Sequence, residues 1–215
     1  MDRLFFSPDH QEILHLSKKD KKLSKLIEEV GTIEIALDRD YYSFLIKRII
    51  AQQLSLKSAY TITKRVEQLW LGLKPEHLQN ISDNDLRSAG VSRPKLKYMH
   101  HLTEQVLNGN LQFNRFIHLD DNEVMKELLE VKGIGKWTAE MFLIFSLGRL
   151  NVLSFGDVSI QNSIRWLYKI PKDVPLELNF YYEKWKPYNS IASLYLWESV
   201  DMGILNKNWE KEGSD

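Results

Sequence analysis

Residues 128–139 read Leu128-Leu-Glu-Val-Lys-Gly-Ile-Gly-Lys-Trp-Thr-Ala139, a Gly-x-Gly turn between two stretches of helical periodicity. The stretch before the turn, Asp121 to Leu129, predicts a short helix, and the stretch after it, Trp137 to Leu147, is apolar on almost every side. A helix that is apolar all round belongs in a protein core. The sequence therefore predicts a helix, a glycine hairpin and a buried central helix, in that order.

The hairpin offers backbone N–H groups to a ligand. Those of Gly135, Lys136 and Trp137 stand at the start of the second helix, where they lack an intrahelical partner and lie at its positive end. Such a position suits a phosphate group. An ordinary helix–helix turn that uses glycine for its freedom at φ explains the pattern equally well. The local sequence leaves both interpretations open, but the spacing is not that of a nucleotide-binding P-loop.

Helical periodicity continues through most of the 215 residues. Apolar residues repeat at three- and four-residue steps in segments 40–53, 57–71, 94–109, 159–168 and 188–200. Strand-like alternation of useful length is absent, and the best candidate, Thr32 to Leu37, is short. The chain is 43% hydrophobic and 27% charged, and its length suits one compact domain or two small lobes. These observations predict an all-α globular protein.

Composition excludes several classes of site. The chain has no cysteine, which excludes disulfides, thiolate zinc sites, cysteine nucleophiles and cysteine-ligated iron–sulfur clusters. Lys+Arg and Asp+Glu both number 29, so net charge indicates no particular ligand. No stretch reaches the roughly 18 uncharged residues of a membrane span, and the apolar run at the N-terminus is too short for a signal peptide. We therefore expect a soluble intracellular protein.

A carboxylate stands where another helix is expected to begin. Asp157 lies in Phe155-Gly-Asp-Val-Ser159, directly before the helical segment that ends at Tyr168. An aspartate there satisfies an unpaired N–H group and offsets the helix dipole, so an N-cap is the ordinary interpretation. The functional interpretation is a carboxylate that the helix end keeps ionised for chemistry. Both can hold at once.

Aromatic residues are frequent in segment 137–197. They are Trp137, Trp166, Tyr181, Tyr182, Trp185, Tyr188, Tyr195 and Trp197. Core packing explains most of them. Two of them facing one another would form a flat pocket that binds a planar cationic ring by stacking and cation–π attraction.

Taken together, four ordered blocks resemble the helix–hairpin–helix DNA glycosylases and, among them, the 3-methyladenine DNA glycosylase II family. The blocks are Ile49-Ile-Ala-Gln-Gln-Leu-Ser55, the hairpin segment 128–139, Asp157, and Trp185-Lys-Pro-Tyr188 through Leu194-Tyr-Leu-Trp197. The resemblance implies two helical lobes with DNA across the cleft and no N-terminal β domain. One lobe would be residues 36–147, carrying the wedge and hairpin, and the other residues 1–35 plus 148–215, carrying the catalytic aspartate.

The resemblance implies roles for individual residues. Asp157 falls on the catalytic aspartate, which would stabilise the cation-like sugar and orient the attacking water. Gln53 falls on the residue that wedges into the duplex where the flipped base was. The base pocket would be Trp137, Trp197 and Met141, and the hairpin's DNA contacts Gly133, Gly135, Lys136 and Thr138.

The same resemblance implies the ligands. No organic cofactor is expected, but the backbone carbonyls of Val131 and Ile134 would hold a structural monovalent cation, Na⁺ or K⁺, that bridges the hairpin to a phosphate. The expected partner is double-stranded DNA, with no membrane and no obligate protein partner, and the expected state is a monomer. The expected location is the cytoplasm, with the nucleoid, of a prokaryote, or the nucleus of a eukaryote.

The implied reaction is hydrolysis of the N-glycosidic bond of alkylated purines, such as 3-methyladenine or 7-methylguanine, in base excision repair. Bifunctional relatives carry a lysine directly after the hairpin, and Trp137 at that position cannot form a Schiff base, which predicts hydrolysis without lyase activity. The missing cysteines exclude the iron–sulfur branches of the family. Three departures from the family pattern bear on the lesion range: no proline precedes Asp157, Lys132 replaces a common proline, and Met141 replaces a tyrosine.

Two alternatives remain at this stage. One is a non-catalytic damage-binding protein that uses the same hairpin and wedge. The other is a glycosylase for another lesion, such as hypoxanthine, ethenoadenine or uracil.

Overall fold

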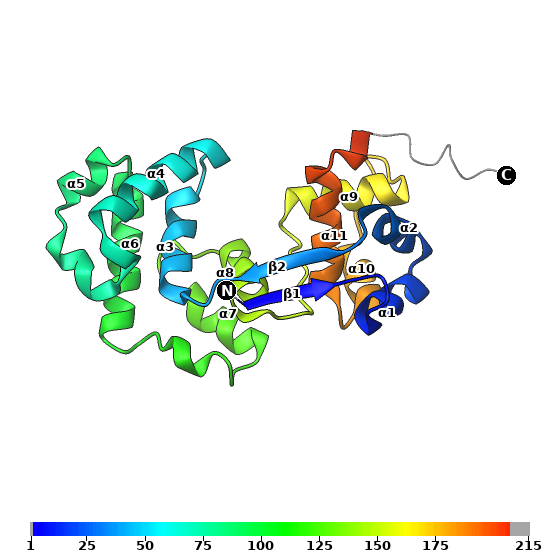
Figure 1. Cartoon of the computed structure of the whole chain (residues 1–215), viewed down its shortest axis with the longest axis horizontal. Helices are drawn as coiled ribbons and strands as arrows, with labels where there is room; N and C mark the ends of the chain where they lie inside the picture. Colours follow the sequence, from blue (N-terminus) through cyan, green and yellow to red (C-terminus); the bar gives the residue numbers. More distant parts are fainter. Residues whose placement is uncertain (1, 207–215) are drawn as a thin grey trace. The chain divides into compact units, whose positions relative to one another are not determined.

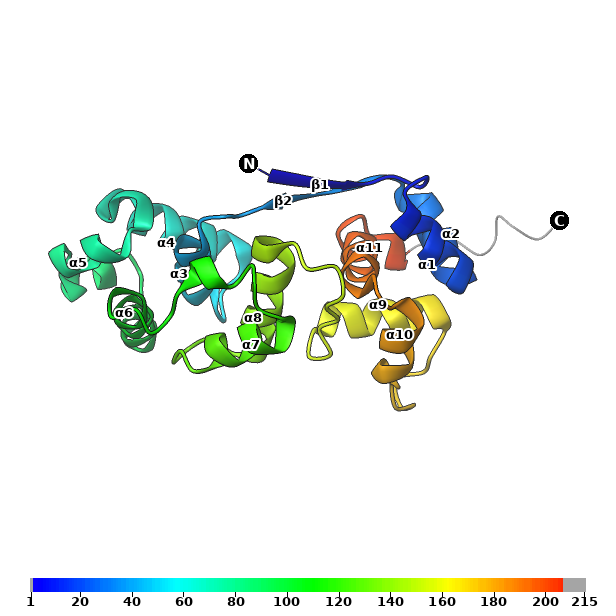
Figure 2. The ribbon, with the colours of Figure 1, turned by 90° about the horizontal axis from the view of Figure 1, so that it is seen from below.

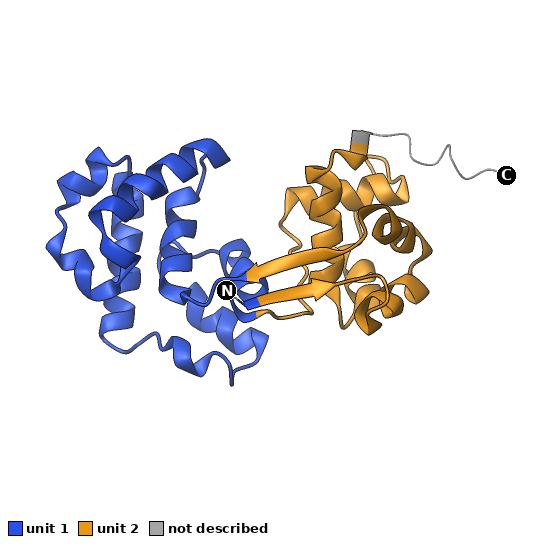
Figure 3. Ribbon diagram, in the orientation of Figure 1, with its two compact units in different colours: residues 1–2, 37–147 blue, residues 3–36, 148–215 orange. Residues whose placement is uncertain are grey.

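The structure is a computed structural model, and it describes residues 2–206 (Figure 1). Helices dominate it, as expected for the all-α class, and two short strands form one small sheet. The chain divides into two compact units, unit 1 with residues 1–2 and 37–147 and unit 2 with residues 3–36 and 148–215 (Figure 3). The helices of this part of the chain lack the length and apolar character that crossing a membrane requires.

Unit 1 is built around one buried helix. Its helices are α3 (Tyr41–Ala51), α4 (Leu56–Leu69), α5 (Asp83–Ser88), α6 (Arg93–Leu107), α7 (Asp121–Leu129) and α8 (Lys136–Phe142). Short 3₁₀ turns lie at Leu71–Leu73, Pro75–Asn80 and Phe113–Arg115. Helix α3 packs against α4, α6 and α8 and buries Leu45, Ile46 and Ile49 completely. Each such side chain stabilises the fold by roughly 1.5–3 kcal/mol.

The apolar segment after the hairpin differs from its prediction in one respect. The sequence predicted a single buried helix to Leu147, and the segment is indeed mostly buried. The α-helix ends at Phe142, however, and continues as a π-helical stretch, Leu143–Leu147. Asp2 falls in unit 1 together with Arg39, whose Nε donates to the Asp2 carboxylate at 3.0 Å.

Unit 2 surrounds helix α11. Its elements are β1 (Asp2–Phe6), α1 (Gln11–Lys19), α2 (Lys21–Val30), β2 (Ile33–Leu37), α9 (Val158–Tyr168), α10 (Leu178–Trp185), α11 (Asn189–Asp201) and a 3₁₀ turn at Ile204–Asn206. The first residue of β1, Asp2, and the last residue of β2, Leu37, are counted in unit 1. Helix α11 packs against α2, α9 and α10, and both ribbon views show it beside α9 (Figures 1 and 2). Buried Ile191, Tyr195 and Leu196 make it the core helix of this unit.

A buried carboxylate links the two segments of chain that form unit 2. Asp20 is 1% exposed; its Oδ1 accepts from Leu23 N at 3.1 Å and caps α2. Its Oδ2 accepts from Trp185 Nε1 at 2.9 Å and from the Tyr168 hydroxyl, and lies 2.8 Å from Lys184 Nζ. Burial alone would raise the pKa of Asp20, but the hydrogen bonds from Lys184, Tyr168 and Trp185 hold it below its ordinary value.

The small sheet was not predicted. Strands β1 and β2 pair, and their arrows in Figure 1 point in opposite directions. In β2 the buried residues Ile33, Ile35 and Leu37 alternate with exposed ones, which is the pattern of a half-buried strand. The segment is short, and its partner lies near the N-terminus, so the pairing could not be inferred from local periodicity. Helices α1, α2, α5 and α10 were likewise absent from the prediction.

Candidate active site

The two glycines of the hairpin have different reasons to be glycine. Gly133 has φ of +89°, and a Cβ there would lie 2.2 Å from Cγ of Tyr98, so only glycine fits. Gly135 has φ of −93°, and a Cβ there would meet nothing within 4 Å. The fold therefore requires Gly133, which is the ordinary explanation of a turn. It does not require Gly135, where the missing side chain leaves the backbone at the start of α8 approachable.

Two side chains from elsewhere in unit 1 hold the hairpin. Gln52 Nε2 donates to the carbonyl of Gly133 at 2.7 Å, and Lys132 N donates to Nδ1 of His101 at 3.1 Å. Neither Gln52 nor His101 was predicted to have a role. Hydrogen bonds between side chain and backbone across 81 and 31 residues leave no local pattern. The position of Gln52 beside the predicted wedge was the one available signal.

The first turn of α8 carries the other hairpin residues. Trp137 is 43% exposed, and the exposed Lys136 places Nζ 3.9 Å from Oε1 of Glu140. A lysine at a helix N-terminus is disfavoured by the helix dipole, and a nearby anion offsets that cost. Thr138 and Met141 are buried within the same helix. Their predicted contacts to DNA and to a base remain predictions.

The predicted wedge lies in the turn between α3 and α4. Gln53 is exposed and has φ of +55°, a left-handed conformation that is uncommon for a residue other than glycine. Leu54 and Leu56 beside it are also exposed, Leu56 by 92%. An accessible tip of this kind suits the wedge role, which remains a prediction.

Asp157 caps helix α9 in unit 2, so the N-cap interpretation is confirmed. Its Oδ1 accepts from Ile160 N at 3.0 Å, and the carboxylate is held in a turn closed by Asp157 N and the carbonyl of Ser154 at 3.2 Å. The residue is only 8% exposed. The side chain of Gln161 fixes the preceding loop by donating to the carbonyl of Phe155 at 2.7 Å. The result is a buried, oriented carboxylate at the positive end of an 11-residue helix.

Fewer of the predicted aromatic residues of unit 2 are core residues than expected: Tyr181, Trp185 and Tyr195 are buried, and Trp166, Tyr182, Tyr188 and Trp197 are half-buried. Trp185 and Tyr195 are fully buried, and Trp197 lies on α11. Helix α11 is joined to α9 next to Trp197, because Ser163 Oγ on α9 donates to the carbonyl of Leu196 at 3.0 Å. Unit 2 thus brings the helix capped by Asp157 against the helix that carries Trp197. Its pocket role remains a prediction.

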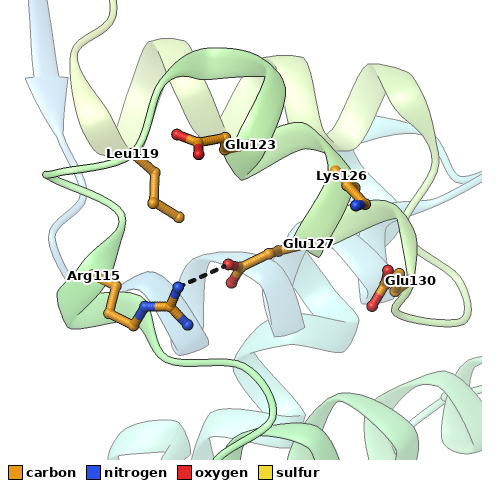
Figure 4. A pocket seen from close by; sticks show the side chains of 6 residues that line it. All are labelled: Arg115, Leu119, Glu123, Lys126, Glu127 and Glu130. Atoms are coloured by element: carbon orange, nitrogen blue, oxygen red, sulfur yellow. Dashed lines mark ion pairs between the residues drawn. The ribbon is translucent and has the colours of Figure 1, made fainter.

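A cavity of about 270 Å³ in unit 1 does not coincide with these residues (Figure 4). It is lined by Arg115, Leu119, Glu123, Lys126, Glu127 and Glu130. Arg115 Nη2 lies 3.7 Å from Oε1 of Glu127 across it. Its walls carry three glutamates and two basic residues, so it offers no concentration of positive charge for the anionic backbone of DNA.

The hairpin between two helices and the aspartate at the next helix start identify the family. The model of the HhH-GPD superfamily of base excision DNA repair proteins matches residues 46–187. This chain belongs to that superfamily.

Solved and curated relatives from this superfamily cover nearly the whole chain. A crystal structure of a DNA-3-methyladenine glycosidase from Bacillus halodurans is 40% identical, with a TM-score of 0.85 and 94% of each chain covered. DNA-3-methyladenine glycosylase 1 of Schizosaccharomyces pombe is 30% identical over 90% of this chain and 89% of its own length. A structure of an S. pombe 3-methyladenine DNA glycosylase in complex with abasic DNA is 29% identical, with a TM-score of 0.77, covering 89% of this chain and 97% of that one.

Proposed function

We propose that this base excision repair protein is a monofunctional DNA glycosylase that hydrolyses the N-glycosidic bond of alkylated purines in double-stranded DNA. Its membership of the HhH-GPD superfamily and its relatives named 3-methyladenine glycosylases support a glycosylase for alkylated bases. The observation that carries the proposal is Asp157, a buried carboxylate oriented at the start of α9. The type II assignment and the absence of lyase activity rest on individual residues.

Asp157 would carry the chemistry. In an N3- or N7-alkylated purine the base bears a positive charge, so the glycosidic C1′–N9 bond breaks readily and its electron pair returns to the base. The sugar left behind resembles a cation, which a fixed carboxylate stabilises electrostatically. Asp157 also orients a water molecule, whose oxygen forms the new bond to C1′. The proton that this water releases goes to the carboxylate of Asp157, directly or through solvent. The products are the free base and an abasic site.

Unit 1 would grip the DNA. The N–H groups at the start of α8 and the ammonium of Lys136 suit a phosphate, and Gln53 would fill the space that a flipped nucleotide leaves. Trp137 and Trp197 would stack on a cationic base. Trp137 stands where a lyase needs an amine, so no covalent imine with the sugar forms.

A monovalent cation at the hairpin is part of the proposal. Backbone carbonyls are the oxygen ligands that Na⁺ and K⁺ accept, and the carbonyls of Val131 and Ile134 would supply them. The carbonyl of Val131 already accepts Ile134 N at 3.0 Å, and its second lone pair leaves it able to bind a cation. Such an ion would add positive charge where the hairpin meets a phosphate.

Substitution of Asp157 by Asn tests the catalytic role. Asn caps a helix about as well as Asp, so Asp157→Asn removes the charge and keeps the fold. We expect the single-turnover release of 3-methyladenine from methylated duplex DNA to fall by roughly 10²- to 10³-fold, with duplex affinity nearly unchanged. Asp40→Asn is the matched control, because Asp40 caps α3 by accepting from Ser43 N at 3.2 Å. Excision that persists in Asp157→Asn would disprove the assignment of the catalyst.

The lesion and the reaction class need separate measurements. Base release from duplexes carrying 3-methyladenine, 7-methylguanine, hypoxanthine, ethenoadenine or uracil should be fastest for the cationic purines. Release of none of these bases, with tight binding to damaged DNA, would favour a damage-binding protein instead. Borohydride should trap no covalent protein–DNA adduct, because Trp137 offers no amine.

A further inference from the structure

The turn that carries Gln53 is held in a conformation that glutamine does not favour. Its φ of +55° costs about 1 kcal/mol relative to ordinary backbone, so neighbouring contacts have to maintain it. The helix before the turn ends at Ala51, and the next helix begins at Leu56. Within the turn, Leu54 N donates to the carbonyl of Ala51 at 3.2 Å, while the side chains of Gln53, Leu54 and Ser55 are exposed.

Two hydrogen bonds hold the turn from outside. Lys95 Nζ donates to the carbonyl of Ile50 at 2.7 Å, in the last turn of α3, where a cation also complements the helix dipole. Burial at this place lowers the pKa of Lys95. Gln52 Nε2 donates to the carbonyl of Gly133 at 2.7 Å, so the residue directly before Gln53 is attached to the hairpin. The proposed wedge is therefore one residue away from a direct bond to the proposed phosphate site.

Helix α6 supports both segments. Lys95, Tyr98 and His101 lie three residues apart along α6, and each is turned by about 60° around the helix from the one before. Lys95 bonds the end of α3, the Tyr98 ring lies against Gly133, and His101 Nδ1 accepts from Lys132 N at 3.1 Å. The turn and the hairpin thus share one rigid support, and all of these contacts lie within unit 1.

We propose that Gln52 is a positioning residue that couples the wedge turn to the hairpin. The hydrogen bond makes the two segments one DNA-reading element, so that the grip of the hairpin on a phosphate and the insertion of Gln53 occur together. A plug stabilises a flipped nucleotide only when it is placed to within a fraction of an ångström, and a loose turn loses that placement. This inference rests on the proposed function, because it assumes that Gln53 enters the duplex.

The test removes the amide and keeps its volume. Gln52→Met retains the length of the side chain without a donor, and Gln68→Met, at an exposed position on α4, is the matched control. The probe is a duplex with a tetrahydrofuran abasic analogue next to 2-aminopurine, whose fluorescence reports unstacking, compared with the undamaged duplex. We expect Gln52→Met to weaken binding to the abasic duplex by about tenfold with loss of the fluorescence change, and binding to undamaged duplex by less than twofold.

A double variant tests the coupling itself. Gln53→Ala alone should weaken abasic-duplex binding, and adding Gln52→Met should cost less than a further twofold, because the two residues act through one step. Independent, additive losses would overturn the proposal. Equal losses for damaged and undamaged duplexes would also overturn it, because they indicate only a damaged hairpin. Should Gln52→Met unfold, Gln52→Glu, whose ionised carboxylate has no donor for the Gly133 carbonyl, takes its place with the same expected pattern.

The readout separates this proposal from the proposed function. Binding and fluorescence on an abasic analogue require no base release. A wild-type protein that unstacks the 2-aminopurine but excises no alkylated base would disprove the proposed activity and leave the coupling measurable. Normal excision together with additive losses would disprove the coupling alone.

Discussion

Helices α8 and α9 both begin with the positive end of a helix dipole, but different groups occupy the two ends. At α8 the N-cap is Gly135, which has no side chain, and the first helical residue is the cation Lys136. At α9 the N-cap is Asp157, whose own carboxylate accepts the Ile160 N–H group. Both helix ends attract negative charge. At α8 no side chain of the N-cap residue occupies this end, which is where we propose that a phosphate binds, whereas at α9 the carboxylate of Asp157 occupies it.

This difference separates gripping from chemistry. A phosphate site has to expose backbone N–H groups, so its rigidity comes from contacts behind it, such as those of Gln52 and His101. A carboxylate proposed to act on a sugar has to be fixed in one orientation, and Asp157 is buried and held by the N–H group of Ile160 within its own turn.

The largest effect is expected at the hairpin glycines. Gly133→Ala forces a Cβ to 2.2 Å from the Tyr98 ring at a φ of +89°, and should lower the free energy of unfolding by about 3 to 4 kcal/mol. Gly135→Ala should change it by less than about 0.5 kcal/mol, because nothing lies within 4 Å of the added carbon. Urea unfolding followed by circular dichroism measures both.

The affinity of the Gly135→Ala variant for DNA tests whether the start of α8 binds a phosphate. Folded Gly135→Ala should bind duplex DNA several-fold more weakly, because the methyl group stands where a phosphate approaches. Unchanged affinity would show that the start of α8 is an ordinary turn.

The second effect compares two aspartates that cap helices of unit 2. Asp20→Asn removes a charge held by Lys184, Tyr168 and Trp185, and should lower the free energy of unfolding by about 2 to 3 kcal/mol. Asp157→Asn should leave stability within about 0.5 kcal/mol and remove activity instead. Asp173→Asn, at an exposed position, is the control for the loss of a charge. A large loss of stability in Asp157→Asn would make that residue structural.

The smallest effect is the dependence of stability on pH. Because the pKa of Asp20 is lowered from an ordinary value of 3.8 in the folded protein, its contribution to stability is complete above 3.8. That contribution is lost as the pH falls through the lower folded pKa. Unfolding titrations from about pH 5 to about pH 2 should therefore show a steeper acid loss for the wild type than for Asp20→Asn. Parallel acid limbs would mean that Asp20 carries no lowered pKa.

Long helices with regular periodicity were predictable from sequence. The segments that became α3, α4, α6, α7, α9 and α11 carry apolar residues at helical spacing, and Gly109 with φ of +73° stands just past the end of α6, as a stop signal does. Helices α1 and α10 and the β1–β2 pair were missed. Their apolar positions become a coherent face only against partners far along the chain, as Asp20 of the N-terminal segment and Trp185 of α10 show.

The sequence by itself determined the helical class, the hairpin and the superfamily, because those signals are local and ordered along the chain; the catalytic and DNA-binding roles that it suggests stay predictions. The tertiary structure alone decided which hairpin glycine is required by packing and that Gln52 and His101 hold the turn. It also showed that the buried carboxylate of Asp20 has hydrogen-bond and ion-pair partners at both oxygens. Hydrogen bonds that span dozens of residues depend on where separate helices meet, and no spacing along the chain records that distance.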